Sequence, residues 1–211
     1  MSKKNKRMNS LTGKIHRLGH ASFRLDLVKT IYIDPYQLAD NLPKADIIIC
    51  THSHFDHCSP EDIAKIRDAK TTLVVTADSA EKVSGNVQII APGESLVFGK
   101  IKIEAVPAYN TNKSFHPKEN GWIGVIIDDG NVRIYHTGDT DLIPEMKNVD
   151  ADVWLVPVSG TYVMTAEEAA EIINEVKPAA AVPMHYGAIV GSKADAEKFA
   201  ELVGEKAVIL E

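Results

Sequence analysis

The chain has 211 residues, 45% of them hydrophobic, so it is long enough to bury a sizeable core in one large domain or two small ones. Its formal net charge of −6 argues against a nucleic-acid-binding protein, although a local basic groove would escape a count over the whole chain. No apolar run approaches the length of a transmembrane helix, and no apolar segment of a secretory signal follows the basic residues 1–7.

Residues 1–10 are polar and charged, and we expect a flexible tail there, followed by a single domain over residues 11–211. The two cysteines, Cys50 and Cys58, do not make a disulfide framework, so the expected location is the reducing cytoplasm. A homo-oligomer is compatible with the sequence, and no membrane partner is expected.

The first part of the chain predicts short strands. Apolar and polar residues alternate over residues 15–17 and 22–27, and residues 30–33 form a third apolar segment. Residues 46–50 differ, because consecutive apolar residues are typical of a strand that is covered on both faces. Ser59, followed by Pro60 and two acidic residues, predicts the start of a helix that runs to about residue 68.

The rest of the chain predicts more strands and then an alternation of strands and helices. A short helix is expected at residues 79–83 and a hairpin turn at residues 128–131. A long polar segment at residues 107–121 is typical of a functional or mobile loop. Amphipathic helices are predicted at residues 165–176 and 193–203. Strands are predicted at residues 72–76, 87–90, 96–98, 101–106, 122–127, 132–136, 153–156, 179–183 and 207–210.

Residues that commonly bind metals are concentrated directly after the strand at residues 46–50. They are His52, His54, Asp56 and His57. Imidazole nitrogens and carboxylate oxygens are the ligands that zinc-type divalent ions prefer. A spacing of two residues cannot place all four on one helical face, whereas a turn that leaves a strand can direct them at one or two ions. The alternative, a histidine-rich surface loop, is disfavoured by the strand before the motif and the capped helix after it.

Two later strand ends carry the same kinds of side chain, at Asp139 and His185. Taken singly, an aspartate after a glycine is typical of a turn, and a lone histidine is typical of a hydrogen-bonded core residue. In open α/β sheets, however, sites collect at the carboxyl ends of the strands. Together with residues 52–57, the two residues provide enough ligands for two metal ions.

Three segments resemble the metallo-β-lactamase superfamily: Thr-His-Ser-His-Phe-Asp-His at residues 51–57, Thr-Gly-Asp-Thr at 137–140 and Pro-Met-His-Tyr-Gly at 183–187. The resemblance points to a branch of small metal-dependent hydrolases that includes the ascorbate-phosphate lactonase-like proteins. Residues 19–23 and 33–35 resemble the opening of that branch, and the likeness covers about residues 13–211. It implies an α/β (α+β) fold, an αβ/βα four-layer sandwich of two mixed β-sheets with helices outside and the site along one edge.

The resemblance also implies a role for each ligand-type residue. His52 and His54 would hold a first metal ion, Asp56, His57 and His185 would hold a second, and Asp139 would bridge the two. Asp56 would in addition orient the nucleophilic water, as a carboxylate beside a metal ion does well. His20 and His136 are expected beside the ligands, in contact with them rather than binding an ion.

One position departs from the family. The family usually supplies a third histidine for the first metal ion after the strand at residues 101–106, where this chain has Tyr109 and Asn110. Either His116, six residues beyond Asn110, is that ligand, or Asn110 or water fills the place and one ion is held tightly. His116 could instead contact the substrate or face solvent.

The resemblance and the ligand set predict a metal-dependent hydrolase. Two neighbouring cations would lower the pKa of a shared water, so that hydroxide attacks a carbonyl or phosphorus centre. The expected substrate is a small anionic molecule with a lactone, ester, amide or phosphodiester bond, and a nuclease is disfavoured by the negative net charge. A non-catalytic metal-binding or ligand-sensing protein of the same fold is the alternative. Zinc or manganese is expected, and iron or nickel also suits histidine and carboxylate ligands.

Two further expectations concern residues near the motif. Cys58 follows the ligand cluster directly, but a small buried residue at the head of a helix is a more common role for cysteine than a nucleophile. The shape of the substrate pocket is expected to depend on the loop at residues 107–121 and on residues near Thr161 and Tyr162.

Overall fold

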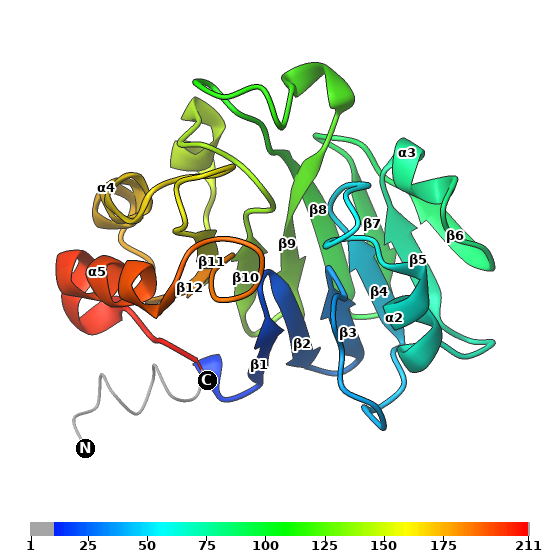
Figure 1. The fold of residues 1–211 in the computed structure, drawn as a ribbon. Coiled ribbons are helices and arrows are strands. Elements are labelled where there is room, and N and C mark those ends of the chain that lie inside the picture. The colour runs from blue at the N-terminus through cyan, green and yellow to red at the C-terminus, as the bar shows by residue number, and fades with distance from the viewer. Residues whose placement is uncertain (1–10, 211) are drawn as a thin grey trace.

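The computed structural model describes residues 11–210, so the predicted tail at residues 1–10 lies outside the described part of the chain. Within residues 11–210, two six-stranded sheets face each other, with helices on their outer sides (Figure 1). The strand order is β1-β2-β3-β4-β5-β6 in the first sheet and β12-β11-β10-β9-β8-β7 in the second. This arrangement confirms the predicted αβ/βα sandwich of two mixed sheets.

The first sheet begins as an antiparallel meander and continues with parallel strands. β1 to β3 pair antiparallel, and β3 to β6 pair parallel. The strands are β1 (Ile15–Gly19), β2 (Ser22–Asp26), β3 (Thr30–Ile33), β4 (Ile47–Cys50), β5 (Thr72–Val75) and β6 (Asn86–Ile89). Each of them agrees with a predicted strand to within a residue or two at its ends.

The second sheet repeats this plan. β7 to β10 pair antiparallel, and β10 to β12 pair parallel. The predicted hairpin turn joins β9 to β10, where Asp129 Oδ1 accepts hydrogen bonds from the amides of Asn131 and Val132. The strands are β7 (Ser95–Phe98), β8 (Ile101–Pro107), β9 (Ile123–Asp128), β10 (Arg133–His136), β11 (Val153–Pro157) and β12 (Ala180–Met184).

The helices start where the sequence provides caps. Ser59 accepts a hydrogen bond from the amide of Asp62, and Thr165 and Glu168 form a capping box. The short helix starts two residues before the predicted position, where Thr76 Oγ1 bonds to Asp78 and Ser79. The elements are α2 (Pro60–Ile66), α3 (Ala77–Ala80), α4 (Ala166–Val176), α5 (Lys193–Val203) and the 3₁₀ turns η1 (Lys118–Asn120), η2 (Pro144–Asn148) and η3 (Gly204–Lys206).

Apolar side chains fill three layers. The largest cluster lies between the sheets, a second joins the second sheet to α4 and α5, and a third joins the first sheet to α2. β4 shows how its apolar run serves two layers, because Ile47 and Ile49 face the other sheet while Ile48 and Cys50 face α2. None of the helices within residues 11–210 has the length and apolar character needed to cross a membrane.

The predicted strand at residues 207–210 is wrong. The chain forms only an isolated parallel bridge there, between Ala181 and Ala207, with the amide of Val208 donating to the carbonyl of Ala181. The ladder does not continue, because Pro183 in β12 has no N–H for the next hydrogen bond. β12 therefore remains the edge of its sheet.

One close backbone approach at the start of β9 supports the segment that carries Asp139. A Cβ atom added at Gly124 would lie 2.5 Å from the carbonyl oxygen of Thr137 and 2.7 Å from its carbonyl carbon. Real Cβ contacts are not this short, so any side chain at position 124 would push β9 away from the end of β10.

We therefore expect Gly124→Ala to destabilise the protein by about 1–3 kcal/mol, the usual cost of overpacking a closed core. Urea denaturation followed by circular dichroism measures this as a lower midpoint. Val97→Ala is the control, since Val97 is 66% exposed on β7 and should leave the midpoint near that of the wild type. A wild-type midpoint for Gly124→Ala would contradict the close approach.

Candidate metal centre

The histidine-rich segment folds into a tight turn at the end of β4. The amides of His57 and Cys58 both donate to the carbonyl of His54, at 3.0 and 2.9 Å. This turn brings His52 Nε2 to 3.1 Å from His54 Nδ1. The Trp122 ring packs against both imidazoles, with centroids 4.8 and 4.7 Å away, and limits their rotation.

Asp139 meets three imidazoles that come from distant parts of the chain. Its Oδ2 atom lies 2.9 Å from His185 Nε2, 3.3 Å from His116 Nε2 and 3.4 Å from His57 Nε2. The sequence separates these residues widely, and the fold joins them because they follow β4, β8, β10 and β12 at one edge of the sandwich. The predicted convergence of the strand-end residues is present.

The possible ligand atoms form three overlapping groups, each with all its atoms within 4.8 Å of one another. These groups show which of the predicted metal ligands lie close together. His116 is in the group of the first predicted ion, and His20 joins the group of the second. The groups are His52, His54 and His116; His52, His57 and Asp139; and His20, Asp56, His57 and His185.

Asp34 fixes the orientation of two of these histidines. Its Oδ2 atom accepts hydrogen bonds from His57 Nδ1 and from the Thr51 hydroxyl, both at 2.7 Å. Because the Thr51 hydroxyl donates to Asp34, its oxygen is left to accept from His52 Nδ1 at 3.0 Å. Both imidazoles therefore carry a proton on Nδ1 and direct Nε2 into the site.

Asp34 belongs to residues 33–35, which resemble the opening of the family branch, but the sequence predicted no role for it. The signal that could have found it is the one used for Asp139, a carboxylate directly after a buried strand. Asp34 is fully buried and has a positive φ of 48°, a backbone conformation that non-glycine residues seldom adopt. Such strain persists only where the surroundings hold it, and it often marks a functional site.

His116, in the loop between β8 and β9, is also held through its Nδ1 atom. Its Nδ1 atom lies 3.1 Å from Asn110 Oδ1 and 3.2 Å from the carbonyl of Tyr162, and both of these are acceptors. The proton is therefore on Nδ1, and Nε2 faces His52, His54 and Asp139.

Asn110 supports His116 in the loop between β8 and β9. Its Oδ1 atom also accepts the amide of His116 at 2.9 Å, and its Nδ2 atom donates to Asp141 and to the carbonyl of Tyr162. Both ends of the Asn110 amide are therefore engaged, and together they fix the position of the His116 ring.

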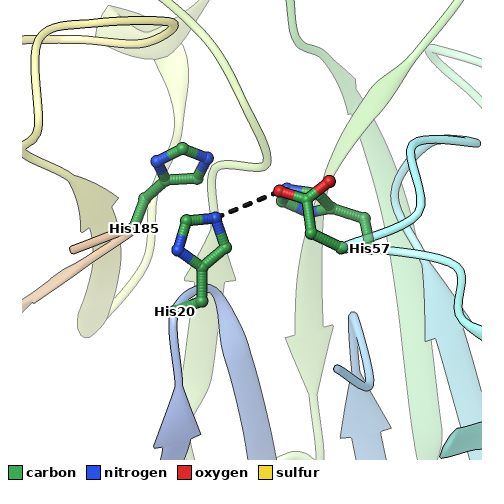
Figure 2. A group of neighbouring side chains, drawn as sticks. His20, His57 and His185 are labelled. Atoms are coloured by element: carbon green, nitrogen blue, oxygen red, sulfur yellow. Dashed lines mark hydrogen bonds and ion pairs between the residues drawn. The ribbon is translucent and has the colours of Figure 1, made fainter. Parts of the chain in front are cut away.

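His185 and His20 complete the group around Asp56. His185 Nδ1 lies 3.1 Å from Ser159 Oγ, and the amide of His185 donates to the carbonyl of His20. His20 Nε2 contacts Asp56 Oδ2 at 3.1 Å. Figure 2 shows the rings of His20, His57 and His185 gathered around one space, with the contact of His20 to the carboxylate dashed. His20 was expected beside the ligands, and it touches them.

His136 links two backbone segments next to the site. Its Nε2 atom lies 2.9 Å from the carbonyl of Ala21, and its Nδ1 atom accepts from the amide of Gly138. Both ring nitrogens are therefore engaged with the backbone, one at the β1–β2 turn and the other beside Asp139. Cys58 is buried among the residues that pack between the first sheet and α2, as its predicted structural role requires.

The buried charges influence one another strongly. Burial tends to raise the pKa of Asp139, but the neighbouring His185 and His57 hold it well below its ordinary value. Burial tends to raise the pKa of Asp56 as well, and its contacts with His20 and His57 hold it below the usual range. Conversely, burial tends to lower the pKa of His57, whereas Asp139 and Asp34 raise it well above normal. A divalent ion at Nε2 would take the place of the proton on His57.

Polar atoms without hydrogen bonds test whether this set fits a metal ion. His57 Nε2, His116 Nε2 and Asp139 Oδ1 are buried and make no hydrogen bond within the described chain. Buried polar atoms normally have hydrogen-bond partners, so three atoms of one cluster that lack them need an explanation. Nitrogen and carboxylate oxygen atoms with their other positions already anchored are the donor set of a zinc-type ion, and the residues fit it.

Comparisons with known proteins agree with this chemistry. Residues 14–185 match the family described as the beta-lactamase superfamily domain. A metal-dependent hydrolase of Thermoplasma acidophilum is 34% identical in an alignment of length 202, which covers 88% of this chain and 88% of the relative. A metal-dependent hydrolase of Thermococcus onnurineus is 33% identical in an alignment of length 215, which covers 93% of this chain and 95% of the relative.

Solved structures share the fold. A crystal structure from Parabacteroides distasonis, described as that of a metal-dependent hydrolase, matches with a TM-score of 0.81 and 31% identity and covers 93% of each chain. A crystal structure from Thermotoga maritima, described as that of a Zn-dependent hydrolase of the metallo-beta-lactamase superfamily, matches with a TM-score of 0.62 and 23% identity and covers 93% of this chain and 97% of its own.

Asp34 orients both His57 and, through Thr51, His52, and this leads to a prediction. Asp34→Asn removes the charge that holds the Nδ1 proton of His57 and the Thr51 hydroxyl, so we expect metal affinity to fall by about 10–100-fold. Competition with a chromogenic zinc chelator measures the affinity. Asp129→Asn is a matched control, because Asp129 is also a buried carboxylate but lies in the β9–β10 hairpin turn. Equal affinity of Asp34→Asn and the wild type would refute the role of Asp34.

Proposed function

Because this chain belongs to the beta-lactamase superfamily and is a metal-dependent hydrolase, we propose that it uses a metal-activated water to cleave a lactone, ester, amide or phosphodiester bond in a small anionic substrate. The observation that carries the proposal is the common orientation of the buried imidazoles. His52, His57 and His116 each have Nδ1 tied to an acceptor and Nε2 directed at Asp139 or its neighbours.

We propose that the site holds two ions, zinc or manganese. His52, His54 and His116 would hold the first, and Asp56, His57 and His185 would hold the second, with His20 as the remaining member of that group. Asp139 is suited to bridge them, since its Oδ2 atom lies within 3.3 Å of a histidine from each set, His116 and His185. The choice between metals depends on supply as well as on ligand type.

The residues around the ions have separate tasks. When bound, the metal supplies Lewis-acid activation of a water molecule and stabilises charge that develops on the substrate. Asp56 stays ionised at neutral pH because its contacts with His20 and His57 hold its pKa below the usual range, so it can accept a hydrogen bond from the attacking water and orient it. Burial lowers the pKa of His20, so a neutral His20 can support Asp56 through its 3.1 Å contact.

A small-molecule substrate is favoured over a nucleic acid by the surroundings of the site. The cavity beside the ligands has a volume of about 280 Å³, at the low end for small-molecule sites. None of the lysines and arginines within residues 11–210 lines it, whereas a nucleic-acid groove needs cationic side chains along the phosphate backbone. The cytoplasmic location remains a prediction.

The reaction itself can be tested with Asp56→Asn. We expect the variant to lose about 10²–10⁴-fold in kcat, because the amide has no charge with which to orient water. Zinc- or manganese-loaded protein would be assayed on bis(p-nitrophenyl) phosphate and a panel of lactones, esters and amides, with bound metal measured in parallel. Asp129→Asn should keep wild-type rates. Undiminished turnover by Asp56→Asn would contradict the role, and metal binding without any turnover by the wild type would favour a sensing protein.

The place of His116 can be tested by counting ions. We expect elemental analysis to find two ions per wild-type chain and one in His116→Ala, because the first group would keep only two histidines. His16→Ala is the matched control, since the His16 side chain is 41% exposed and pairs with Asp26 away from the site. Two ions per chain in His116→Ala would show that His116 does not hold the first metal.

A further inference from the structure

Apolar side chains gather around the mouth of the metal centre. The cavity of about 280 Å³ is lined by ligand-type residues on its floor and by four other side chains. Those four are Phe55, Phe115, Tyr162 and Ile189, which we call the apolar rim. They come from different segments: the turn after β4, the β8–β9 loop, the segment between β11 and α4, and the segment after β12.

The exposure of these residues is unusual. Phe55 is 63% exposed, Phe115 49% and Ile189 38%, and each is among the few large hydrophobic residues that are exposed within residues 11–210. The remaining exposed ones, such as Val28 and Val97, do not line the cavity. Scattered apolar residues on a surface need no explanation, but several that surround one concave site mark a place where a ligand covers them.

The aromatic rings of the rim are supported in fixed positions. Phe115 meets Tyr162 edge to face, with centroids 4.6 Å apart at 79°, and Phe55 meets Tyr36 in the same manner at 5.7 Å and 76°. Such pairs stabilise one arrangement of the rings. The rim is therefore preformed, and binding an apolar group there costs little side-chain ordering.

The basic side chains of the described chain do not reach the apolar rim. Among residues 11–210, the cavity lining includes no lysine or arginine. Two lysines of the β8–β9 loop are engaged elsewhere, since Lys113 pairs with Asp141 at 2.6 Å and Lys118 with Glu145 at 3.0 Å. A negative charge on a substrate can thus be met at the metal centre, but a charged group away from the reacting bond would lie against hydrocarbon and lose its hydration.

We propose that the apolar rim is a specificity subsite that binds an uncharged aryl or alkyl group next to the scissile bond. The substrate class is then an ester, lactone, amide or phosphodiester whose negative charge, if any, is confined to the reacting group. Phe55, Phe115 and Ile189 determine this specificity by covering the apolar group. The inference rests on the proposed hydrolase function, and a binding measurement that needs no turnover tests it separately.

Three esters with the same leaving group provide the kinetic test on zinc-loaded protein. They are p-nitrophenyl acetate, p-nitrophenyl phenylacetate and mono-p-nitrophenyl succinate, which differ in whether the acyl group is small, aromatic or charged. We expect kcat/KM for the phenylacetate to exceed that for the acetate by about 10–100-fold, a usual return for an apolar group in an apolar pocket. Equal values for these two esters, or the highest value for the succinate, would overturn the subsite.

Variants show whether the rim causes this preference. In Phe55→Ala/Phe115→Ala and in Ile189→Ala, we expect the phenylacetate-to-acetate ratio of kcat/KM to fall at least several-fold toward unity. The ratio is the readout because any loss of metal from a neighbouring ligand lowers both rates together. Val97→Ala removes an equally exposed apolar side chain outside the cavity and should keep the wild-type ratio. Unchanged ratios in both rim variants would contradict the proposal.

A binding measurement separates this proposal from the proposed function. If the protein hydrolyses none of the esters, the hydrolase proposal fails for this class, and calorimetric titration of zinc-loaded protein still tests the rim. We expect benzylphosphonate to bind about tenfold more tightly than methylphosphonate, and the double variant to lose that difference. Equal affinities of the wild type for the two phosphonates would overturn the subsite, whatever the enzyme assays show.

Discussion

The metal centre depends on one constraint: the imidazoles are tied down through Nδ1 so that Nε2 faces a shared space. Asp34 accomplishes this for His57 directly and for His52 through the Thr51 hydroxyl. Asn110 and the carbonyl of Tyr162 do the same for His116. A neutral imidazole with a proton on one nitrogen offers a lone pair on the other, so these acceptors decide where the ligand atoms point. Without these acceptors, the ring nitrogens of the histidines could form hydrogen bonds with one another or with the backbone. Both ring nitrogens of His136 are bonded to the backbone in this way.

Packing between the two sheets stabilises the edge of the sandwich that carries these buried polar side chains. The apolar layer between them holds the ends of β3, β4, β10 and β12 in place while polar side chains project from one edge. Three residues at that edge, His20, Asp34 and His185, have positive φ angles. Non-glycine residues keep such conformations only where the surrounding packing holds them, so the apolar core stabilises the strained backbone at this edge of the sandwich. The buried atoms without hydrogen bonds also destabilise the protein, and an ion bound by them would offset this.

Most of the strands and part of the candidate site could be predicted from the sequence, because local patterns of apolar and polar residues determine them. Alternating and continuous apolar runs predicted every strand of both sheets, and polar residues after strand ends predicted the convergence of Asp139 and His185 on the motif. The misses have tertiary causes. Pro183 ends a ladder that the apolar residues 207–210 would otherwise extend. The position of His116 depends on Asp141, whose buried carboxylate binds the amides of Thr111 and Asn112 and so shapes the loop. The apolar rim combines residues from distant segments, and no single stretch of sequence carries its signal.

Anomalous X-ray diffraction from crystals of the zinc-loaded protein tests the metal centre most directly. We expect strong zinc peaks at the edge of the sandwich, one within reach of Nε2 of His116 and one within reach of Nε2 of His57 and His185, with Asp139 between them. Peaks at other places, or His57 and His116 whose Nε2 atoms face protein acceptors instead of zinc, would contradict it.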